Sequence, residues 1–232
     1  MNPRSAAVLT IDGPSGTGKG TLARRIKSWL GWHLLDSGAL YRVCAFYAES
    51  RGVALDDESG VAALAASLPV EFIESAHDTR VLLDGHDVSD VIRSEQAGAS
   101  ASRVAVLAPV RAALLERQRA FQQAPGLVAD GRDMGTVVFP HAELKIYLTA
   151  SVEERAHRRH KQLNEKGMGV NLRQLLGDIA ERDRRDEQRS ISPLKPATDA
   201  IILDTTDSDI AAVVEHVKRL VQQTGLACGA SS

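Results

Sequence analysis

The sequence predicts an α/β fold with a five-stranded parallel sheet. Short apolar segments typical of buried strands alternate with longer segments of helical periodicity. Each apolar segment ends in a polar or glycine-rich turn, which is typical of strands joined by crossover helices. The chain has 232 residues, of which 44% are hydrophobic and 25% charged, so it can bury a substantial core. We therefore expect a three-layer arrangement in which helices cover the sheet.

Five apolar segments are the expected strands, at residues 8–11, 33–35, 127–129, 144–148 and 200–203. A helix is expected at residues 20–30, because its apolar residues share one face and Gly31 can end it. A last helix is expected at residues 208–223, where apolar residues again recur at helical spacing. Functional residues should follow the strands, because the carboxyl ends of parallel strands meet at one edge of a sheet.

The interval 41–126, between the second and third strands, is too long for one crossover helix. Within it, residues 70–73 and 80–83 with a turn at residues 84–87 resemble an antiparallel hairpin. Helical segments are expected before the hairpin at residues 61–68 and after it at residues 95–123. We expect an inserted subdomain here, within a single domain that spans residues 1–232.

Composition excludes several classes of function. The formal net charge of −2 gives no overall attraction to nucleic acid or to an anionic membrane. Cys44 and Cys228 are far apart, which is neither a metal-binding spacing nor a disulfide framework and suits a reducing compartment. No apolar segment approaches the length of a membrane span or resembles a signal peptide. We expect a cytoplasmic protein with no nucleic-acid or membrane partner, and a monomer by default.

A glycine-rich segment between the first strand and the first helix is predicted to bind phosphate. Backbone N–H groups of such a loop and the positive end of the helix dipole can surround phosphate oxygens. Lys19 would reach the β- and γ-phosphates of a nucleotide. The alternative, a glycine-rich turn with a solvated lysine, is disfavoured by the spacing and flanks. We call residues 13–21 the phosphate loop: Gly13, Pro14, Ser15, Gly16, Thr17, Gly18, Lys19, Gly20 and Thr21.

The loop departs from its commonest form, because Gly20 follows Lys19 and the hydroxyl comes one residue later at Thr21. Direct ligation of Mg²⁺ by protein is therefore not expected, and Thr21 and Asp130 are candidates to act through water. The sequence contains no guanine-specificity motif, no dinucleotide fingerprint, no His-Glu-x-x-His and no Cys-x-x-Cys. GTPase, dinucleotide and zinc chemistry therefore have no support.

Polar residues follow the second strand, where Asp36 and Ser37 precede Arg42. Two interpretations of this segment stay open: Arg42 faces phosphate, or Asp36 or Ser37 caps a helix and Arg42 lies on the surface. The third strand ends in Asp130, Arg132 and Asp133 between glycines. Asp130 could hold water on Mg²⁺, Arg132 could bind phosphate and Asp133 could accept from a base amino group, the alternative being a turn of internal ion pairs.

Residues 155–189 carry ten Lys or Arg against six Asp or Glu. Residues 151–154 form a capping-box pattern, so a helix is expected to begin there and to carry its basic residues outward. A mobile basic flap with glycine hinges is one interpretation, and a solvated charged face is the other. Further along, Arg182, Asp186 and Arg189 are spaced to share one helical face, either to bind an anion or to form a salt-bridge ladder. The expected outward residues are Arg155, Arg158, Arg159 and Lys161, and the expected hinges are Gly167 and Gly169.

Together, the phosphate loop and residues 34–42, 130–140 and 182–194 closely resemble bacterial cytidylate kinases. The resemblance covers nearly the whole chain. It implies a parallel-sheet P-loop core, a nucleoside-monophosphate-binding insertion within residues 41–126 and a short lid at residues 153–189. It also implies transfer of the γ-phosphoryl group of ATP to CMP or dCMP with Mg²⁺.

The same resemblance implies a set of site residues. The acceptor phosphate would be held by Arg42, Arg132 and Arg189, and the sugar by Ser37, Arg182 and Asp186. The base would contact Ser102, Arg111 and Asp133. Lys19, Arg155 and Arg158 would spread the charge that develops on the transferred phosphoryl group, together with Arg132 and Arg189.

Two alternatives remain beside this interpretation. One is a P-loop kinase for another small acceptor, such as shikimate, gluconate or a different nucleotide. The other is a nucleotide-dependent regulator or nucleic-acid-binding module that uses its basic segment without catalysis. The inserted subdomain argues against the first alternative, and the net charge argues against the second.

Overall fold

The computed structural model describes residues 6–74, 79–165, 167 and 169–226. The chain divides into two compact units. The first comprises Met1–Asp36 and Arg119–Ser232, and the second is Ser37–Gln118. Cys228, which the composition analysis noted, lies outside the described residues.

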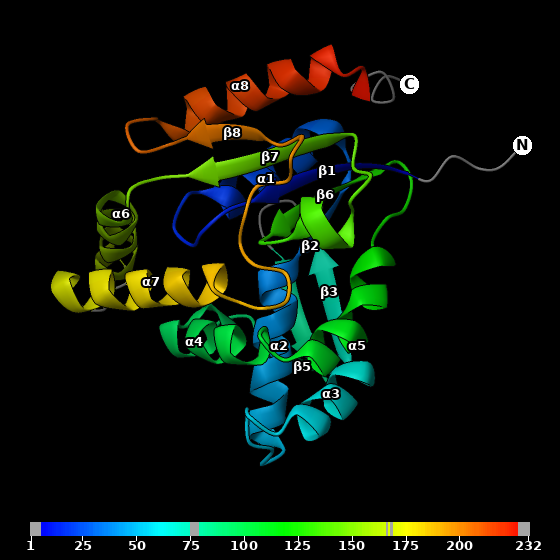
Figure 1. The fold of residues 1–232 in the computed structure, drawn as a ribbon, viewed down its shortest axis with the longest axis vertical. Coiled ribbons are helices and arrows are strands. Elements are labelled where there is room, and N and C mark those ends of the chain that lie inside the picture. Colours follow the sequence, from blue (N-terminus) through cyan, green and yellow to red (C-terminus); the bar gives the residue numbers. More distant parts are fainter. Residues whose placement is uncertain (1–5, 75–78, 166, 168, 227–232) are drawn as a thin grey trace, which may run out of the picture. The chain divides into compact units, whose positions relative to one another are not determined.

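A five-stranded, fully parallel sheet forms the centre of the first unit (Figure 1). Its spatial order is β2-β6-β1-β7-β8, so β1 is the middle strand. The prediction of an α/β fold with this sheet is confirmed, and each strand lies within two residues of its expected position. The strands are β1 (Ala7–Asp12), β2 (His33–Asp36), β6 (Gly126–Gly131), β7 (Leu144–Thr149) and β8 (Ile201–Asp204).

Two helices, α1 (Lys19–Leu30) and α8 (Ile210–Gln223), share one apolar core with β1 and β7. Gly31 ends α1 in the left-handed conformation with φ 66°, as its place in the sequence predicted. Helix α8 begins two residues later than expected, because Asp209 accepts a hydrogen bond from the Ala211 N–H and so caps the helix.

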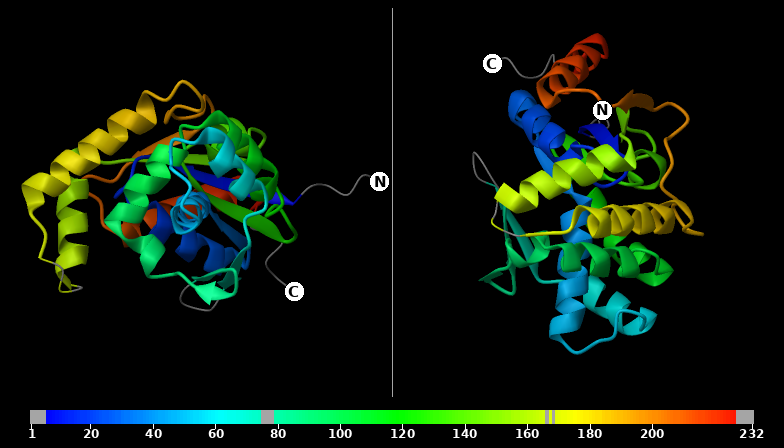
Figure 2. Two further views of the ribbon diagram at one scale, coloured as in Figure 1. Left: turned by 90° about the horizontal axis from the view of Figure 1, so that it is seen from below. Right: turned by 90° about the vertical axis from the view of Figure 1, so that its left-hand side faces the viewer.

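Helices α6 (Val152–Glu165) and α7 (Leu172–Glu187) also belong to the first unit. Helix α6 follows β7 directly beyond the carboxyl end of the sheet (Figure 1). The two helices pack against each other through a small apolar cluster, and they lie side by side in both views of Figure 2. The buried members of the cluster are Ala156, Leu163, Leu175 and Ile179.

The second unit has its own apolar core, and α2 contributes several of its most buried residues. Cys44 lies in this core, where burial raises the pKa of its thiol to about 12. The unit contains three antiparallel strands in the order β3-β4-β5. Its elements are α2 (Ser37–Ser50), α3 (Glu58–Ala66), β3 (Val70–Glu74), β4 (Thr79–Leu83), β5 (His86–Asp87), the 3₁₀ turn η1 (Val91–Arg93), α4 (Glu95–Val104) and α5 (Ala108–Arg119).

Three expectations for this unit need correction. The helix expected at residues 95–123 is two helices, because Pro109 fits only the first turn of α5 and restricts the residue before it. Residues 84–87 are not all turn: the left-handed pair Asp84 and Gly85 makes a two-residue hairpin turn, so the next two residues pair with β4 as β5. Helix α3 begins earlier than expected, because Asp57 accepts from the Gly60 N–H.

Within the part of the chain that the structure describes, no single helix is long and apolar enough to cross a membrane. Helices α4 and α5 pass the same test of length and composition only as a pair, bent by 105°.

Candidate active site

The phosphate loop connects β1 to α1, and two of its side chains donate hydrogen bonds to its own backbone. Gly13 has φ 141°, and a Cβ at this position would overlap the carbonyl oxygen of Leu148. The Pro14 carbonyl accepts from Lys19 Nζ at 2.6 Å and from Thr17 Oγ1 at 3.1 Å. The N-cap residue of α1 is Gly18, and no side-chain hydrogen bond caps the helix there. The first N–H groups of a helix have no partner within the helix, and such groups can bind an anion.

The ammonium group of Lys19 is buried among charged groups. Burial, together with the nearby positive charge of Arg132, lowers the pKa of Lys19 to about 7 against the opposing effect of the Asp130 carboxylate. A phosphate group added beside this lysine would favour its charged form. The position therefore suits an anion.

Asp130 is the next-to-last residue of β6 and is also buried. Its register partners are Ile11 on β1 and Asp36 on β2. Burial, with a contribution from the charge of Asp36, raises the pKa of Asp130 to about 6 against the opposing effect of Lys19. The sheet thus brings a carboxylate with hard oxygen donors beside the lysine of the phosphate loop.

Residues 130–135, which comprise the last two residues of β6 and the turn that follows them, contact the end of α7; we call this segment the 130–135 turn. Arg132 Nε lies 3.0 Å from Asp186 Oδ2, and Arg132 Nη1 also donates to the Gly131 carbonyl. Burial raises the pKa of Asp186, but the charges of Arg132, Arg189 and Arg182 outweigh it and leave the pKa below its ordinary value. The structure therefore brings together four of the predicted charged residues.

The expectation that Arg182, Asp186 and Arg189 share one helical face holds only in part. Helix α7 ends at Glu187, so Arg189 lies beyond the helix. Arg189 Nε donates to the Asp186 carbonyl at 3.2 Å, which keeps its buried side chain close to Asp186 by a different route.

Asp133 is buried at the start of η2 (Met134–Val138), a single π-helical turn. It occupies the N-cap position but makes no capping hydrogen bond with its side chain. The carboxylate of Asp12 accepts from the N–H groups of Met134 and Gly135, each at 2.8 Å. No role was predicted for Asp12, although a charged residue that ends an apolar strand directly before the phosphate loop was a visible signal.

The prediction that α6 carries Arg155 outward was wrong. Arg155 is buried, donates to the carbonyls of Ser15 and Ala150 and forms an ion pair with Asp183. The reason is that the first turn of α6 packs on the phosphate loop, where a Cβ on Gly16 would lie 3.0 Å from Arg155 Cβ. A sequence pattern of basic residues cannot reveal this tertiary contact.

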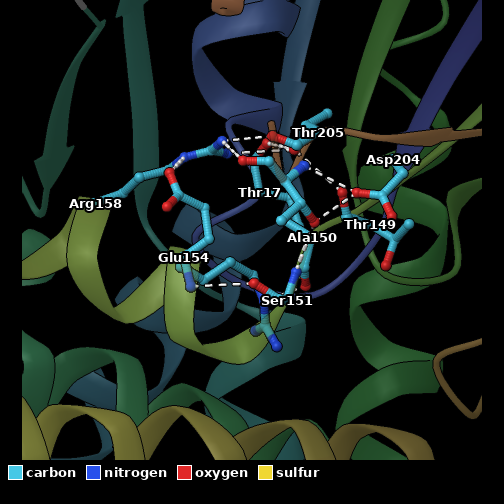
Figure 3. A network of polar contacts seen from close by, with 10 residues as sticks. Thr17, Thr149, Ala150, Ser151, Glu154, Arg158, Asp204 and Thr205 are labelled. Carbon is cyan, nitrogen blue, oxygen red and sulfur yellow. Dashed lines mark hydrogen bonds and ion pairs between the residues drawn. The ribbon is translucent and has the colours of Figure 1, made fainter. Parts of the chain in front are cut away.

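Arg158 is likewise held against the core (Figure 3). Its Nε pairs with Glu154 Oε1 at 2.8 Å, and its other nitrogens donate to Thr205 Oγ1 and to the carbonyls of Thr205 and Thr206. Thr205 Oγ1 lies within donating distance of the Thr17 carbonyl. The arginine thus connects α6 to the segment after β8 and, through it, to the phosphate loop.

The capping-box prediction at the start of α6 is confirmed in one of its two bonds. The Glu154 N–H donates to Ser151 Oγ at 3.2 Å. The Glu154 carboxylate binds Arg158, and the Ser151 N–H donates to Thr206 Oγ1. In a full capping box the Glu154 carboxylate would accept from the Ser151 N–H, but here it pairs with Arg158 instead.

The second unit holds the remaining predicted residues. Ser37 Oγ donates to Gln118 Oε1 at 2.8 Å, and both residues are buried. Gln118 was not singled out by our sequence analysis, and no motif marks it. Arg42 Nη1 donates to the Ile92 carbonyl at 2.8 Å, which excludes a freely solvated surface role for this arginine.

Two further residues of the second unit were predicted to contact a base. Arg111 is buried, donates to the Ala105 carbonyl at 3.3 Å and lies 5.8 Å from the ring centre of Tyr41. Ser102 Oγ is buried, and among the described residues it has no hydrogen-bond partner. A buried hydroxyl of this kind is costly unless a ligand completes its hydrogen bonding.

No cluster of three or more His, Cys, Asp or Glu side chains suited to a metal ion occurs in the described ranges 6–74, 79–165, 167 and 169–226. The two oxygen donors predicted to act on Mg²⁺ through water are Asp130, which is buried, and Thr21, which is partly buried. Carboxylate and hydroxyl oxygens fit Mg²⁺ that keeps several water ligands and binds phosphate.

Comparison with known proteins gives consistent results. The family model for cytidylate kinase matches residues 9–223. A cytidylate kinase of Pseudomonas aeruginosa (strain UCBPP-PA14) is 59% identical over 220 residues, covering 94% of this chain and 96% of that protein. A cytidylate kinase of Azotobacter vinelandii is 56% identical over 222 residues, covering 95% and 97%. The crystal structure of an uncharacterized protein from Eubacterium ventriosum has a TM-score of 0.51 and 9% identity, covering 94% of this chain and 98% of that one, a likeness that concerns the fold alone.

Proposed function

The chain belongs to the cytidylate kinase family, and we propose that it transfers the γ-phosphoryl group of ATP to CMP or dCMP, forming ADP and CDP or dCDP. The observation that carries the proposal is the parallel pairing of β1 with β6, in which Asp12 lies opposite Gly131. This pairing brings the phosphate loop and the 130–135 turn to the same edge of the sheet. A donor phosphate and an acceptor phosphate can therefore be held by neighbouring strands.

The proposed reaction needs no protein nucleophile, because an oxygen of the acceptor phosphate attacks the γ-phosphorus in line. The chain supplies position and charge. Lys19 binds the donor phosphates, and Arg132 and Arg189 bind the acceptor phosphate. The close ion pairing of Arg132 with Asp186 supports a site in which charge is fixed before the substrates arrive.

The proposed donor site includes Mg²⁺, which neutralises phosphate charge when it is bound with ATP. Asp130 and Thr21 are the residues proposed to hold it through water. Deprotonated Asp130 suits this task, and added positive charge beside it favours that form.

Asp133 is the proposed determinant of base choice. A buried carboxylate accepts a hydrogen bond from the exocyclic amino group of cytosine, whereas in uracil it would face an acceptor oxygen and remain an unpaired charge. Uridine nucleotides should therefore be poor acceptors.

The family resemblance and residue chemistry assign further acceptor contacts. We propose that Arg182 and Asp186 contact the sugar and that the second unit is the nucleoside-monophosphate-binding part of the protein. From that unit the proposed contacts are Ser37 for the sugar, Arg42 for the phosphate, and Ser102 and Arg111 for the base.

Residues 153–189 are the proposed lid. Arg155 and Arg158 remain candidates to spread charge in the transition state, and their guanidinium groups would have to exchange backbone carbonyls for phosphate oxygens to do so. We also propose that the enzyme works in the cytoplasm as a monomer, without a nucleic-acid or membrane partner.

A coupled ADP-release assay tests the proposed function. The protein is assayed with ATP, Mg²⁺ and, separately, CMP, dCMP, UMP, AMP, GMP and shikimate. Rapid turnover confined to the two cytidine nucleotides is the expected result. Preference for another acceptor would keep the phosphate loop as the donor site and overturn the base assignment. Absence of turnover with every acceptor, together with no binding of CMP in the absence of ATP, would favour a regulator.

A further inference from the structure

Asp12 is a buried acid that the proposed substrate contacts do not use. It is the last residue of β1, directly before the phosphate loop, and it is 5% exposed. In the register of the sheet it lies opposite Gly131 on β6 and Tyr147 on β7. Asp12 is the one charged residue of β1. Its burial at the end of an otherwise uncharged strand therefore calls for a structural or functional explanation.

Its carboxylate makes two hydrogen bonds to the backbone of the 130–135 turn. One oxygen accepts from the Met134 N–H and the other from the Gly135 N–H, both at 2.8 Å. These N–H groups open the π-helical turn η2, and the first N–H groups of a helical segment have no partner within it. Asp12 therefore caps η2 from a strand 122 residues away along the chain.

This arrangement affects Asp133. Asp133 stands at the N-cap of η2, where an aspartate commonly uses its own carboxylate to cap the helix, but its side chain makes no such bond. Because Asp12 binds the first two N–H groups of η2, the carboxylate of Asp133 is not required for capping.

The turn also fits closely against its neighbours. A Cβ on Gly135 would lie 2.9 Å from Thr10 Oγ1 and 3.1 Å from Lys145 Cδ. The backbone that Asp12 binds is thus packed tightly onto β1 and β7, and it has little room to move while the two hydrogen bonds persist.

Burying a carboxylate costs free energy even when it is hydrogen-bonded, and burial raises the pKa of Asp12 to about 7 against the opposing effect of its two backbone hydrogen bonds. A buried carboxylate that only lowered the stability of the fold could be replaced by a neutral side chain. The geometry indicates a role for this carboxylate, because the backbone that it holds in place directly follows Arg132 and Asp133.

We propose that Asp12 is a positioning residue for the acceptor nucleotide, which fixes the 130–135 turn and thereby aims Arg132 at the acceptor phosphate and Asp133 at the base. This inference rests on the proposed function and deepens it, because it names a residue that acts on acceptor recognition without touching the substrate.

The test compares Asp12→Asn with Glu143→Gln. The asparagine keeps the shape of the side chain but turns an amide N–H₂ toward one of the two N–H donors. Glu143 is the matched control, because its carboxylate accepts from the Val8 N–H at 2.8 Å at the other end of β1 and does not reach the 130–135 turn. For each variant, KM for CMP, KM for ATP, the ratio of kcat/KM for CMP and UMP, and amide hydrogen exchange at residues 134 and 135 are measured.

For Asp12→Asn we expect a rise in KM for CMP and a fall in the CMP-to-UMP ratio, each by about tenfold, the range of one good hydrogen-bonded contact. KM for ATP should stay within about twofold of the wild-type value, because the proposed role of Asp12 concerns contacts to the acceptor and not contacts to ATP. Exchange at residues 134 and 135 should accelerate by about tenfold or more, as expected when a net hydrogen bond of about 1.4 kcal/mol is lost. Glu143→Gln should change none of these quantities.

Unchanged exchange in Asp12→Asn, or faster exchange with unchanged KM for CMP and unchanged base choice, would overturn the proposal. If Asp12→Asn does not fold, Asp12→Ser replaces it, and failure of both to fold would assign Asp12 to stability alone and overturn it as well. Failure of the proposed function is recognised separately, because the wild-type enzyme would then not phosphorylate CMP, whereas hydrogen exchange still decides whether Asp12 fixes the turn.

Discussion

Arg132 and Asp186 form an ion pair, with 3.0 Å between Nε and Oδ2, which joins the 130–135 turn to the end of α7. Family resemblance assigns Arg132 to the acceptor phosphate and Asp186 to the sugar. Their pairing means that both groups are charged and oriented in the absence of substrate. An acceptor bound as proposed would therefore meet a pair that is already assembled, which reduces the ordering that binding requires.

Replacing Asp186 with alanine should destabilise the fold by about 3 kcal/mol, because it removes the carboxylate that is directly paired with a largely buried guanidinium. The value lies at the low end of the range for buried pairs since Arg132 is partly exposed. Urea unfolding of wild-type and variant protein measures it. Asp178→Ala, on an exposed face of the same helix, should change stability by less than about 0.5 kcal/mol, and equal effects of the two variants would contradict the importance of the pair.

Replacing Lys19 with methionine should lower kcat/KM by at least about 100-fold, the loss seen when one preorganised charge-stabilising donor is removed. The melting temperature should not fall, because burial already disfavours the charged form of this lysine. Steady-state kinetics and thermal unfolding check the two parts. Lys27→Met, in the last turn of the same helix, is the control and should keep its activity. A folded Lys19→Met enzyme with wild-type kinetics would refute the donor-site assignment.

Replacing Asp133 with asparagine should lower the preference for CMP over UMP by about 10- to 100-fold, since one well-placed polar contact to a base is worth about 1–3 kcal/mol. The amide can donate to the O4 oxygen of uracil, which the carboxylate cannot. Competition between CMP and UMP in one reaction measures the ratio directly. KM for ATP is the internal control, and a retained preference for CMP would assign base recognition to other residues.

The stability of the protein should depend on pH through Asp12. Its pKa is near 4 in an unfolded chain and about 7 when buried in the folded protein, so the folded state holds more protons between these values. The contribution of Asp12 to stability is therefore complete below about pH 4 and is lost as the pH rises to about 7. Unfolding free energies measured from pH 5 to 8 should show this slope in the wild type.

Other ionisable groups lie near Asp12, so the comparison must be made with Asp12→Asn. Asp130 and Asp133 approach it from the end of β6, Lys19 from the start of α1 and Tyr147 from β7. The variant keeps all four and should lose only the slope that belongs to Asp12. Identical slopes in the two proteins would show that Asp12 does not change its protonation on unfolding in this range.

The sequence predicted the centre of the sheet well because β1 and β6 are buried on both faces and are therefore almost continuously apolar, as residues 127–129 show. The turn between β1 and α1 was equally predictable, because Gly13, Gly16 and Gly18 all have positive φ, a backbone conformation that favours glycine. The break between α4 and α5 was also within reach, because Pro109 marks it.

The orientation of charged side chains was less predictable. Arg155 belongs to a basic helix, and only the packing of that helix on Gly16 turns it inward. The partners of Asp12 lie more than a hundred residues away in the chain. Such contacts depend on which strands are neighbours, and hydrophobic periodicity carries no information on the partners of an individual polar group.

Gly13 and Gly31 both have positive φ, yet their tolerance of mutation should differ sharply. At Gly31 nothing lies within 4 Å of an added Cβ, so asparagine or alanine would cost only backbone strain of about 1 kcal/mol. At Gly13 any β-carbon would overlap the carbonyl oxygen of Leu148. Relief of this overlap would move the end of β7, which directly precedes α6 in the chain. Saturation mutagenesis under selection for activity should therefore recover several residues at position 31 and glycine alone at position 13, so this single carbonyl oxygen limits how far the sequence of the phosphate loop can diverge.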